Sequence, residues 1–130
     1  MNAKLLAHVY LISTIVLSVY SQLIMKWRIS GRFAGVTLPE GIWPKIGVMF
    51  TVLVDPFIFS GLIATFASGL CWMATMSKLE ISYAYPFTSL GFVAVVLLSY
   101  VLFGEALNAW RIVGVLLIVV GVTVASQGAK

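Results

Sequence analysis

Five hydrogen-bonding side chains recur every four residues along an otherwise apolar stretch near the N-terminus. They are Tyr10, Thr14, Ser18, Gln22 and Lys26. Residues four apart share one side of a helix, and a polar side inside a membrane must face partner helices or a wet path. The spacing therefore predicts that Thr14, Ser18 and Gln22 line a substrate path. The structural alternative is that the hydroxyls bond to their own helix and Gln22 joins two helices.

A second polar cluster surrounds Pro86, near the start of the stretch 81–107, and is followed by a mostly apolar run at 92–103. Its members are Tyr83, Tyr85, Thr88 and Ser89. Pro86 removes a backbone donor, and a bilayer tolerates such a weakened helix and clustered hydroxyls only where they face protein or a wet cavity. We assign this cluster to the same path, together with Trp72. The aromatic side chains could instead belong to an interfacial belt.

Charged side chains are sparse and lie near the ends of the apolar stretches. Lys26 is either an anchor that reaches the headgroups or a ligand for a substrate phosphate. Glu105 is either an ordinary helix-end carboxylate or a gating group. The sequence has no nucleotide-binding loop, no metal-ligand cluster and no nucleophile–base pair, so we expect no enzyme, no cofactor and no metal site.

The composition is typical of an integral membrane protein. Hydrophobic residues make up 62% of the 130 residues and charged residues 9%, and the mean hydropathy is +1.10. The predicted fold is all-α, a single transmembrane domain (1–130) with spans at about 5–27, 57–76, 84–103 and 109–125. The net charge of +4 comes without a basic run, so it does not indicate a nucleic-acid partner. Cys71 is the single cysteine, which excludes a disulfide within one chain.

The segment before the second span has a different composition, with two prolines, several glycines and most of the loop charges. Its apolar part, residues 46–54, is too short to cross a membrane and predicts an interfacial or re-entrant helix. Asp55-Pro56 is a helix start signal. In the last span, Gly114, Gly121 and Ala125 share one side and predict a close helix-packing seam.

Several motifs carry a resemblance to a known family. They are YLISTIVLSVYSQLIMKW, SYAYPFTSLGFV, FGEAL and GVLLIVVGV. Together they resemble the drug/metabolite transporter superfamily, and within it the four-span branch that contains the small multidrug resistance exporters. The resemblance covers nearly the whole chain except residues 28–55, where those exporters have a much shorter loop.

The departures from the multidrug exporters bear on mechanism. The resemblance places Ser18 where those exporters carry a membrane-embedded glutamate that binds protons and cationic drug. It places Tyr85 at their span-3 tyrosine and Thr88 at their drug-stacking tryptophan. Gly114 and Gly121 match the seam by which those exporters dimerise. The resemblance thus implies their scaffold without their proton-coupling group.

A different four-span subgroup is similar in three further places. The chain resembles the paired subunits thought to flip aminoarabinose-phosphoundecaprenol. The similar segments are residues 18–22, the end of the inserted segment at 54–56, and the run 71–85 with its Cys-Trp, Thr, Lys-Leu, Ser and Ala-Tyr positions.

The resemblance implies a flippase, or flippase subunit, that moves a polyprenyl-phosphate-linked sugar across the bacterial inner membrane. One four-span unit is too small to enclose a path, so we expect an antiparallel homodimer or a heterodimer with a paralogous four-span subunit, embedded in membrane lipids. The alternatives are a multidrug-type exporter of small organic solutes and a non-transporting membrane partner. The side on which the termini lie stays open.

Overall fold

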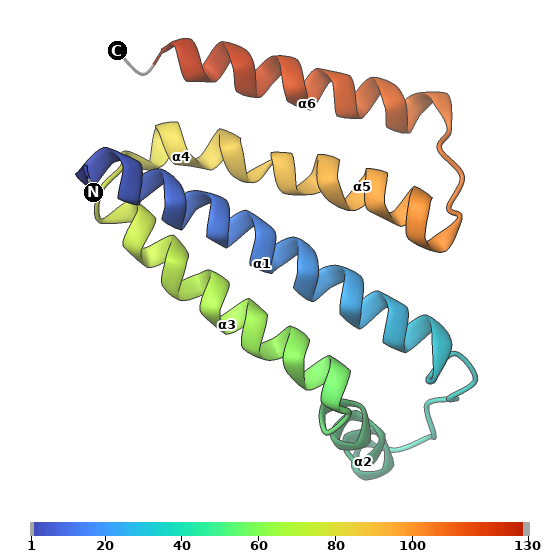
Figure 1. Ribbon diagram of the computed structural model, residues 1–130. Helices are drawn as coiled ribbons and strands as arrows, with labels where there is room; N and C mark the ends of the chain where they lie inside the picture. The colour runs from blue at the N-terminus through green and yellow to red at the C-terminus, as the bar shows by residue number, and fades with distance from the viewer. Residues whose placement is uncertain (1, 129–130) are drawn as a thin grey trace.

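The computed structural model describes residues 2–128 as an all-helical bundle (Figure 1). Its helices are α1 (Ala3–Gly31), α2 (Ile42–Leu53), α3 (Pro56–Met76), α4 (Ile81–Thr88), α5 (Leu90–Phe103) and α6 (Ala109–Gln127). Four stretches are long and apolar enough to cross a membrane: α1, α3, α4 with α5, and α6. No strand occurs within residues 2–128. The predicted all-α fold with four spans and a short helix before the second is confirmed.

The third and fourth spans extend a few residues beyond the predicted bounds, to Ile81 and Gln127, and the observed helices differ from the predicted ones in three further ways. Helix α1 continues to Gly31, because nothing between Trp27 and Gly31 breaks a helix. Helix α2 begins at Ile42 rather than 46, because Pro44 lies in the first turn, where a missing N–H costs no helical hydrogen bond. The third span is interrupted between α4 and α5, close behind Pro86.

Short side-chain caps fix two of the helix starts. Asp55 accepts hydrogen bonds from the backbone N–H groups of Phe57 and Ile58, with Pro56 at the first helical position. Asn108 accepts from the N–H of Arg111 at 2.8 Å, which starts α6. Gly104 ends α5 with a φ of 65°, a left-handed conformation that glycine adopts without strain. The cap at Asp55 is the helix start that the sequence predicts.

Helix α1 lies between α3 on one side and α5 on the other, and α6 lies outermost (Figure 1). Small residues make the approach of α1 and α3 close: Gly61, Ala64 and Ser68 of α3 are buried. Hydroxyl pairs join the same two helices, Ser18 to Ser68 at 2.9 Å and Ser21 to Thr65 at 2.6 Å. In Figure 1 the long helices lie across the view and α2 is seen nearly end-on. Helix α2 is therefore steeply inclined to the long helices at the end of the bundle.

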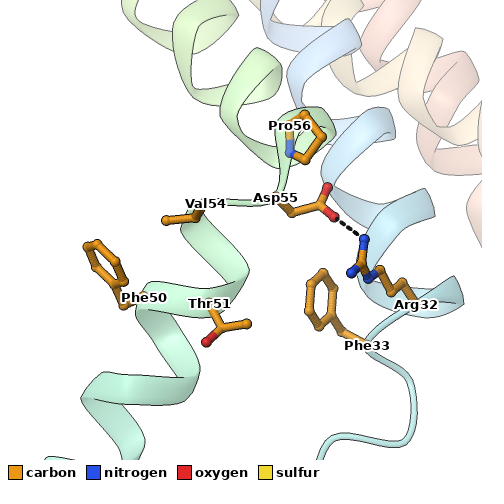
Figure 2. A pocket seen from close by; sticks show the side chains of 7 residues that line it. All are labelled: Arg32, Phe33, Phe50, Thr51, Val54, Asp55 and Pro56. Atoms are coloured by element: carbon orange, nitrogen blue, oxygen red, sulfur yellow. Dashed lines mark hydrogen bonds and ion pairs between the residues drawn. The ribbon is translucent and has the colours of Figure 1, made fainter.

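An ion-pair clamp holds the start of α3 to the end of α1. Nε of Arg28 lies 2.9 Å from one carboxylate oxygen of Asp55 and 3.0 Å from the other. Nη1 of Arg32 lies 3.3 Å from the second oxygen, and Figure 2 shows this Arg32–Asp55 pair. The hydrogen bond from Arg28 holds the pKa of Asp55 below its ordinary value of 3.8. Burial acts in the opposite direction, and the N–H groups of Ile58 and Phe57 lower the pKa further.

The α1–α3 contact provides a stability test at Gly61. A Cβ there would lie 2.9 Å from Cγ2 of Ile24 and 3.1 Å from Cγ of Met25, so we expect Gly61→Ala to destabilise the bundle by about 1–3 kcal/mol. The control is Gly69→Ala in the same helix, where a Cβ meets nothing within 4 Å. That control should be neutral or stabilising by up to about 1 kcal/mol. Thermal unfolding in detergent measures both, and equal melting temperatures for the two variants would contradict the close contact.

The clamp provides a pH test at Asp55. Because the folded-state pKa is below the unfolded-state value of about 3.9, the clamp's stabilisation is complete above that value and is lost as the pH falls through the folded-state pKa. We expect Asp55→Asn to lower the melting temperature at neutral pH and to reduce its fall on acidification. The control is Glu80→Gln, which removes an exposed carboxylate that forms no side-chain cap at the start of α4. An unchanged acid profile for Asp55→Asn would refute the clamp.

Candidate functional site

A hollow of about 180 Å³ lies between α1 and the α4–α5 break. It is lined by Thr14, Ile15, Ser18, Gln22, Thr88, Gly91 and Phe92. Four of these are among the nine side chains that the sequence assigns to a path: Thr14, Ser18, Gln22 and Thr88. The lining carries hydroxyls and an amide but no ionisable group.

The hydroxyls around the hollow already have partners. Thr14 donates to the carbonyl of Tyr10 at 2.9 Å, Ser18 pairs with Ser68, and Thr88 donates to the carbonyl of Tyr85 at 2.6 Å. Gln22 is exposed and its amide forms no hydrogen bond within residues 2–128. A primary amide offers two donors and one acceptor. Gln22 is therefore the polar group best placed to bind a solute in the hollow.

The polar side of α1 divides between two neighbours. Four residues turn an α-helix by about 400°, so a repeat of four drifts by about 40° at each step. Thr14 and Ser18 consequently turn toward Ser68 of α3, whereas Gln22 is exposed on the side that faces α5. Thr14 bonds to its own helix, as the structural alternative predicts, whereas Gln22 joins no second helix by a hydrogen bond within residues 2–128. The assignment of the stripe to a substrate path stays a prediction.

The remaining predicted path residues lie apart from the hollow. Trp72 and Tyr85 form an edge-to-face pair with ring centroids 5.5 Å apart, and Tyr85 is 62% exposed. The hydroxyl of Tyr83 lies 3.2 Å from Nε2 of His8, near the N-terminus. Ser89 donates to the carbonyl of Pro86, which ties its hydroxyl to its own helix turn.

Lys26 and Glu105 meet at the far end of α1. Nζ of Lys26 forms an ion pair with Glu105 and lies 5.4 Å from the ring centroid of Phe103. Nη1 of Arg111 lies 3.8 Å from the other oxygen of Glu105 and donates to the carbonyl of Ala106 at 3.1 Å. Lys26 thus shares the Glu105 carboxylate with Arg111, one turn beyond Gln22. A phosphate role for Lys26 and a gating role for Glu105 stay predictions.

The predicted seam lies on the outermost helix. A Cβ at Gly114 or Gly121 would meet nothing within 4 Å, and Gly121 and Ala125 are exposed. Only Val122 of α6 is buried among the described residues. The seam is therefore open to lipid or to a second subunit.

Sequence reasoning missed some lining residues of the hollow. Gly91 comes near α1, because a Cβ there would lie 3.7 Å from Cγ2 of Ile15 and 3.9 Å from Cγ2 of Val19. Its place two residues after the hydroxyl pair Thr88-Ser89 is the signal that could have identified it. Ile15 and Phe92 carry no such signal, because apolar residues are expected almost everywhere in a membrane span.

Comparison with known proteins places the chain in a family. The EamA-like transporter family matches residues 2–127. A probable 4-amino-4-deoxy-L-arabinose-phosphoundecaprenol flippase subunit ArnF of Proteus mirabilis is 38% identical over 72 residues, 54% of this chain and 54% of that protein. A probable ArnE subunit of the same flippase from Pseudomonas aeruginosa is 34% identical over 77 residues, 59% of this chain and 67% of that protein.

A further similar protein matches over a longer stretch at lower identity. It is a probable ArnF subunit of Photorhabdus laumondii, 29% identical over 130 aligned positions. The alignment, with its gaps, covers 90% of this chain and 93% of that protein. No solved structure matches the chain significantly. The resemblance to aminoarabinose-phosphoundecaprenol flippase subunits is confirmed, and these relatives are named as flippase subunits rather than as enzymes. With four apolar helices long enough to span and a family match over almost its whole length, the chain is a multi-pass membrane protein that belongs to the EamA-like transporter family.

Proposed function

We propose that this chain is a subunit of a flippase that moves a polyprenyl-phosphate-linked sugar across the bacterial inner membrane. The observation that carries the proposal is the amide of Gln22, which bonds to nothing in the described part of the chain and lies in a hollow lined by uncharged groups. A sugar offers hydroxyls that an amide can both donate to and accept from. The names of the similar proteins, which are flippase subunits for such a lipid, support the same substrate class.

The position of the hollow suits a lipid-linked substrate. Gln22 and Phe92 are exposed, so the hollow opens at the surface of the single chain. A polar head could enter the hollow while its apolar tail stays in the bilayer, because burying a long hydrocarbon chain in a polar path would forfeit its favourable transfer to lipid. The absence of an ionisable group among the lining residues argues against a proton- and cation-binding carboxylate at this place.

The transporting unit is proposed to be a dimer with its seam on α6. One four-span chain is too small to enclose a path, and a second four-span chain would complete it while leaving a side opening to the bilayer. Transporter sites often lie between two related halves of inverted topology, which a second copy or a paralogue could supply. The partner is either a paralogous four-span chain, in a heterodimer, or a second copy, in an antiparallel homodimer. The presence of both ArnE and ArnF subunits among the relatives supports the heterodimer.

A substitution at Gln22 tests the path. We expect Gln22→Leu to reduce flipping of a labelled polyprenyl-phosphate sugar in proteoliposomes by about tenfold to a hundredfold, because the lost hydrogen bonds are worth roughly 1–3 kcal/mol. The matched control is Tyr20→Phe, which also removes a hydrogen-bonding group from α1. Tyr20 is exposed but bonds to Ser60 of α3, at 3.0 Å, and does not line the hollow.

The same assay separates the alternatives. Normal flipping by Gln22→Leu, or equal loss in both variants, would refute the proposed path. Proton-coupled uptake of a quaternary ammonium compound without flipping would indicate a multidrug-type exporter. Failure of every substrate to move, with the purified protein folded and supplied with its partner, would indicate a non-transporting subunit.

A substitution at Gly121 tests the seam. A leucine there would separate two helix backbones that approach closely, so we expect Gly121→Leu to shift the crosslinked species in membranes from dimer to monomer. The control is Val119→Leu, an exposed position about 200° around the same helix. An unchanged dimer fraction for Gly121→Leu would place the dimer contact elsewhere.

A further inference from the structure

A second and larger pocket, of about 360 Å³, lies at the end of the bundle where α1, α2 and α3 meet. Its lining residues are Arg32, Phe33, Phe50, Thr51, Val54, Asp55 and Pro56. Figure 2 shows Arg32 and Phe33 on the α1 side, with Thr51 of α2 turned toward them. None of these residues lines the hollow that contains Gln22. The pocket lies beside α3 rather than α5, so it is separate from the proposed path.

The charge in this pocket is positive and concentrated on Arg32. Two guanidinium groups, those of Arg28 and Arg32, face the single carboxylate of Asp55, which leaves one net positive charge. Arg28 is the more enclosed: its side chain is 18% exposed and it lies over the ring of Phe57. The Arg32 side chain is 62% exposed. The excess charge is therefore accessible at Arg32.

Arg32 also has unused hydrogen-bonding capacity. A guanidinium group carries five N–H donors, and Arg32 uses one of them, in its bond to Asp55, within the described part of the chain. Asp55 is fully engaged by two arginines and two backbone N–H groups. The pocket thus has donors for an anion but no available carboxylate for a cationic group such as an amine.

The rest of the pocket is mostly apolar, and Phe50 and Thr51 in its lining belong to α2, which packs only lightly against α3. Phe33, Phe50, Val54 and Pro56 contribute apolar surface, and no residue of α2 is buried. An apolar helix with no buried side in a membrane protein is solvated by lipid, and α2 crosses the bundle end as an interfacial helix does. A ligand here must therefore match one cation and an apolar surface at the level of the headgroups.

We propose that this pocket holds an anionic membrane phospholipid, with its phosphate on Arg32 and its hydrocarbon against Phe33, Phe50 and Val54. Guanidinium groups bind phosphate oxygens by charge-assisted hydrogen bonds. A zwitterionic headgroup fits less well, because its amine would meet the uncompensated positive charge. The lipid secures α2 to the end of the bundle and is a resident ligand, independent of the proposed flipping path.

Binding of phosphatidylglycerol to the purified full chain tests this site. In native mass spectrometry, we expect the wild type to retain phosphatidylglycerol in preference to phosphatidylcholine, and Arg32→Gln to weaken phosphatidylglycerol binding about tenfold. The control is Lys45→Gln, which removes a charge from an exposed position of α2 outside the pocket. That control measures the diffuse attraction of any basic residue to anionic lipid. We therefore expect the phosphatidylglycerol affinity of Lys45→Gln to fall by at most about fivefold.

A second pair of variants tests the apolar contact without changing charge. Phe50 and Met49 are neighbours on α2 and are 67% and 66% exposed, but only Phe50 lines the pocket. Phe50→Ala should weaken phosphatidylglycerol binding more than Met49→Ala does. Excess inorganic phosphate should not displace the lipid.

Two outcomes would overturn the proposal. The first outcome is that phosphatidylglycerol affinity falls equally in Arg32→Gln and Lys45→Gln, and equally in Phe50→Ala and Met49→Ala. It would mean that anionic lipid is attracted diffusely rather than at this pocket. Displacement of phosphatidylglycerol by inorganic phosphate, with Phe50→Ala unchanged, would mean that the pocket binds phosphate alone. Because Arg28 still holds Asp55 in the Arg32→Gln variant, we expect that variant to fold, and its helical content checks this.

Discussion

The need to pair polar groups inside hydrocarbon governs the contact between α1 and α3. A hydroxyl without a partner is costly in a bilayer, where no water is available to replace one. Ser18 meets Ser68 and Ser21 meets Thr65 across this contact, and Gly61 lets the two helices come close enough for those bonds. No buried side-chain polar atom in the described chain lacks a partner.

The same contact sets how α1 is rotated about its axis, and thereby which groups remain available. With Thr14 and Ser18 turned toward α3, Gln22 is exposed on the side of α5. There the break between α4 and α5, together with the missing side chain at Gly91, leaves room for a hollow. The twist of one helix thus separates its hydrogen-bonded hydroxyls from Gln22, the side chain that we propose binds the substrate.

Six charged side chains follow the opposite arrangement, since they lie at one end of the bundle and pair there. Lys26 and Arg111 meet Glu105, and Arg28 and Arg32 meet Asp55. Each cluster contains two cations and one carboxylate, so both retain positive charge. That end of the bundle is consequently suited to phosphate groups at the membrane surface, whether resident or in transit.

Local sequence patterns determined the four spans, the presence of a short helix before the second, the N-cap at Asp55 and the weak point after Pro86, because hydropathy, capping and proline act within a few residues. Only the tertiary structure decided that Gln22 rather than Ser18 remains without a hydrogen bond to residues 2–128, and that Tyr85 lies with Trp72 away from the hollow. It also decided that Asp55 pairs with Arg28, which lies 27 residues away. Those outcomes depend on the rotation of each helix against its neighbours, and a periodicity of four does not specify that rotation.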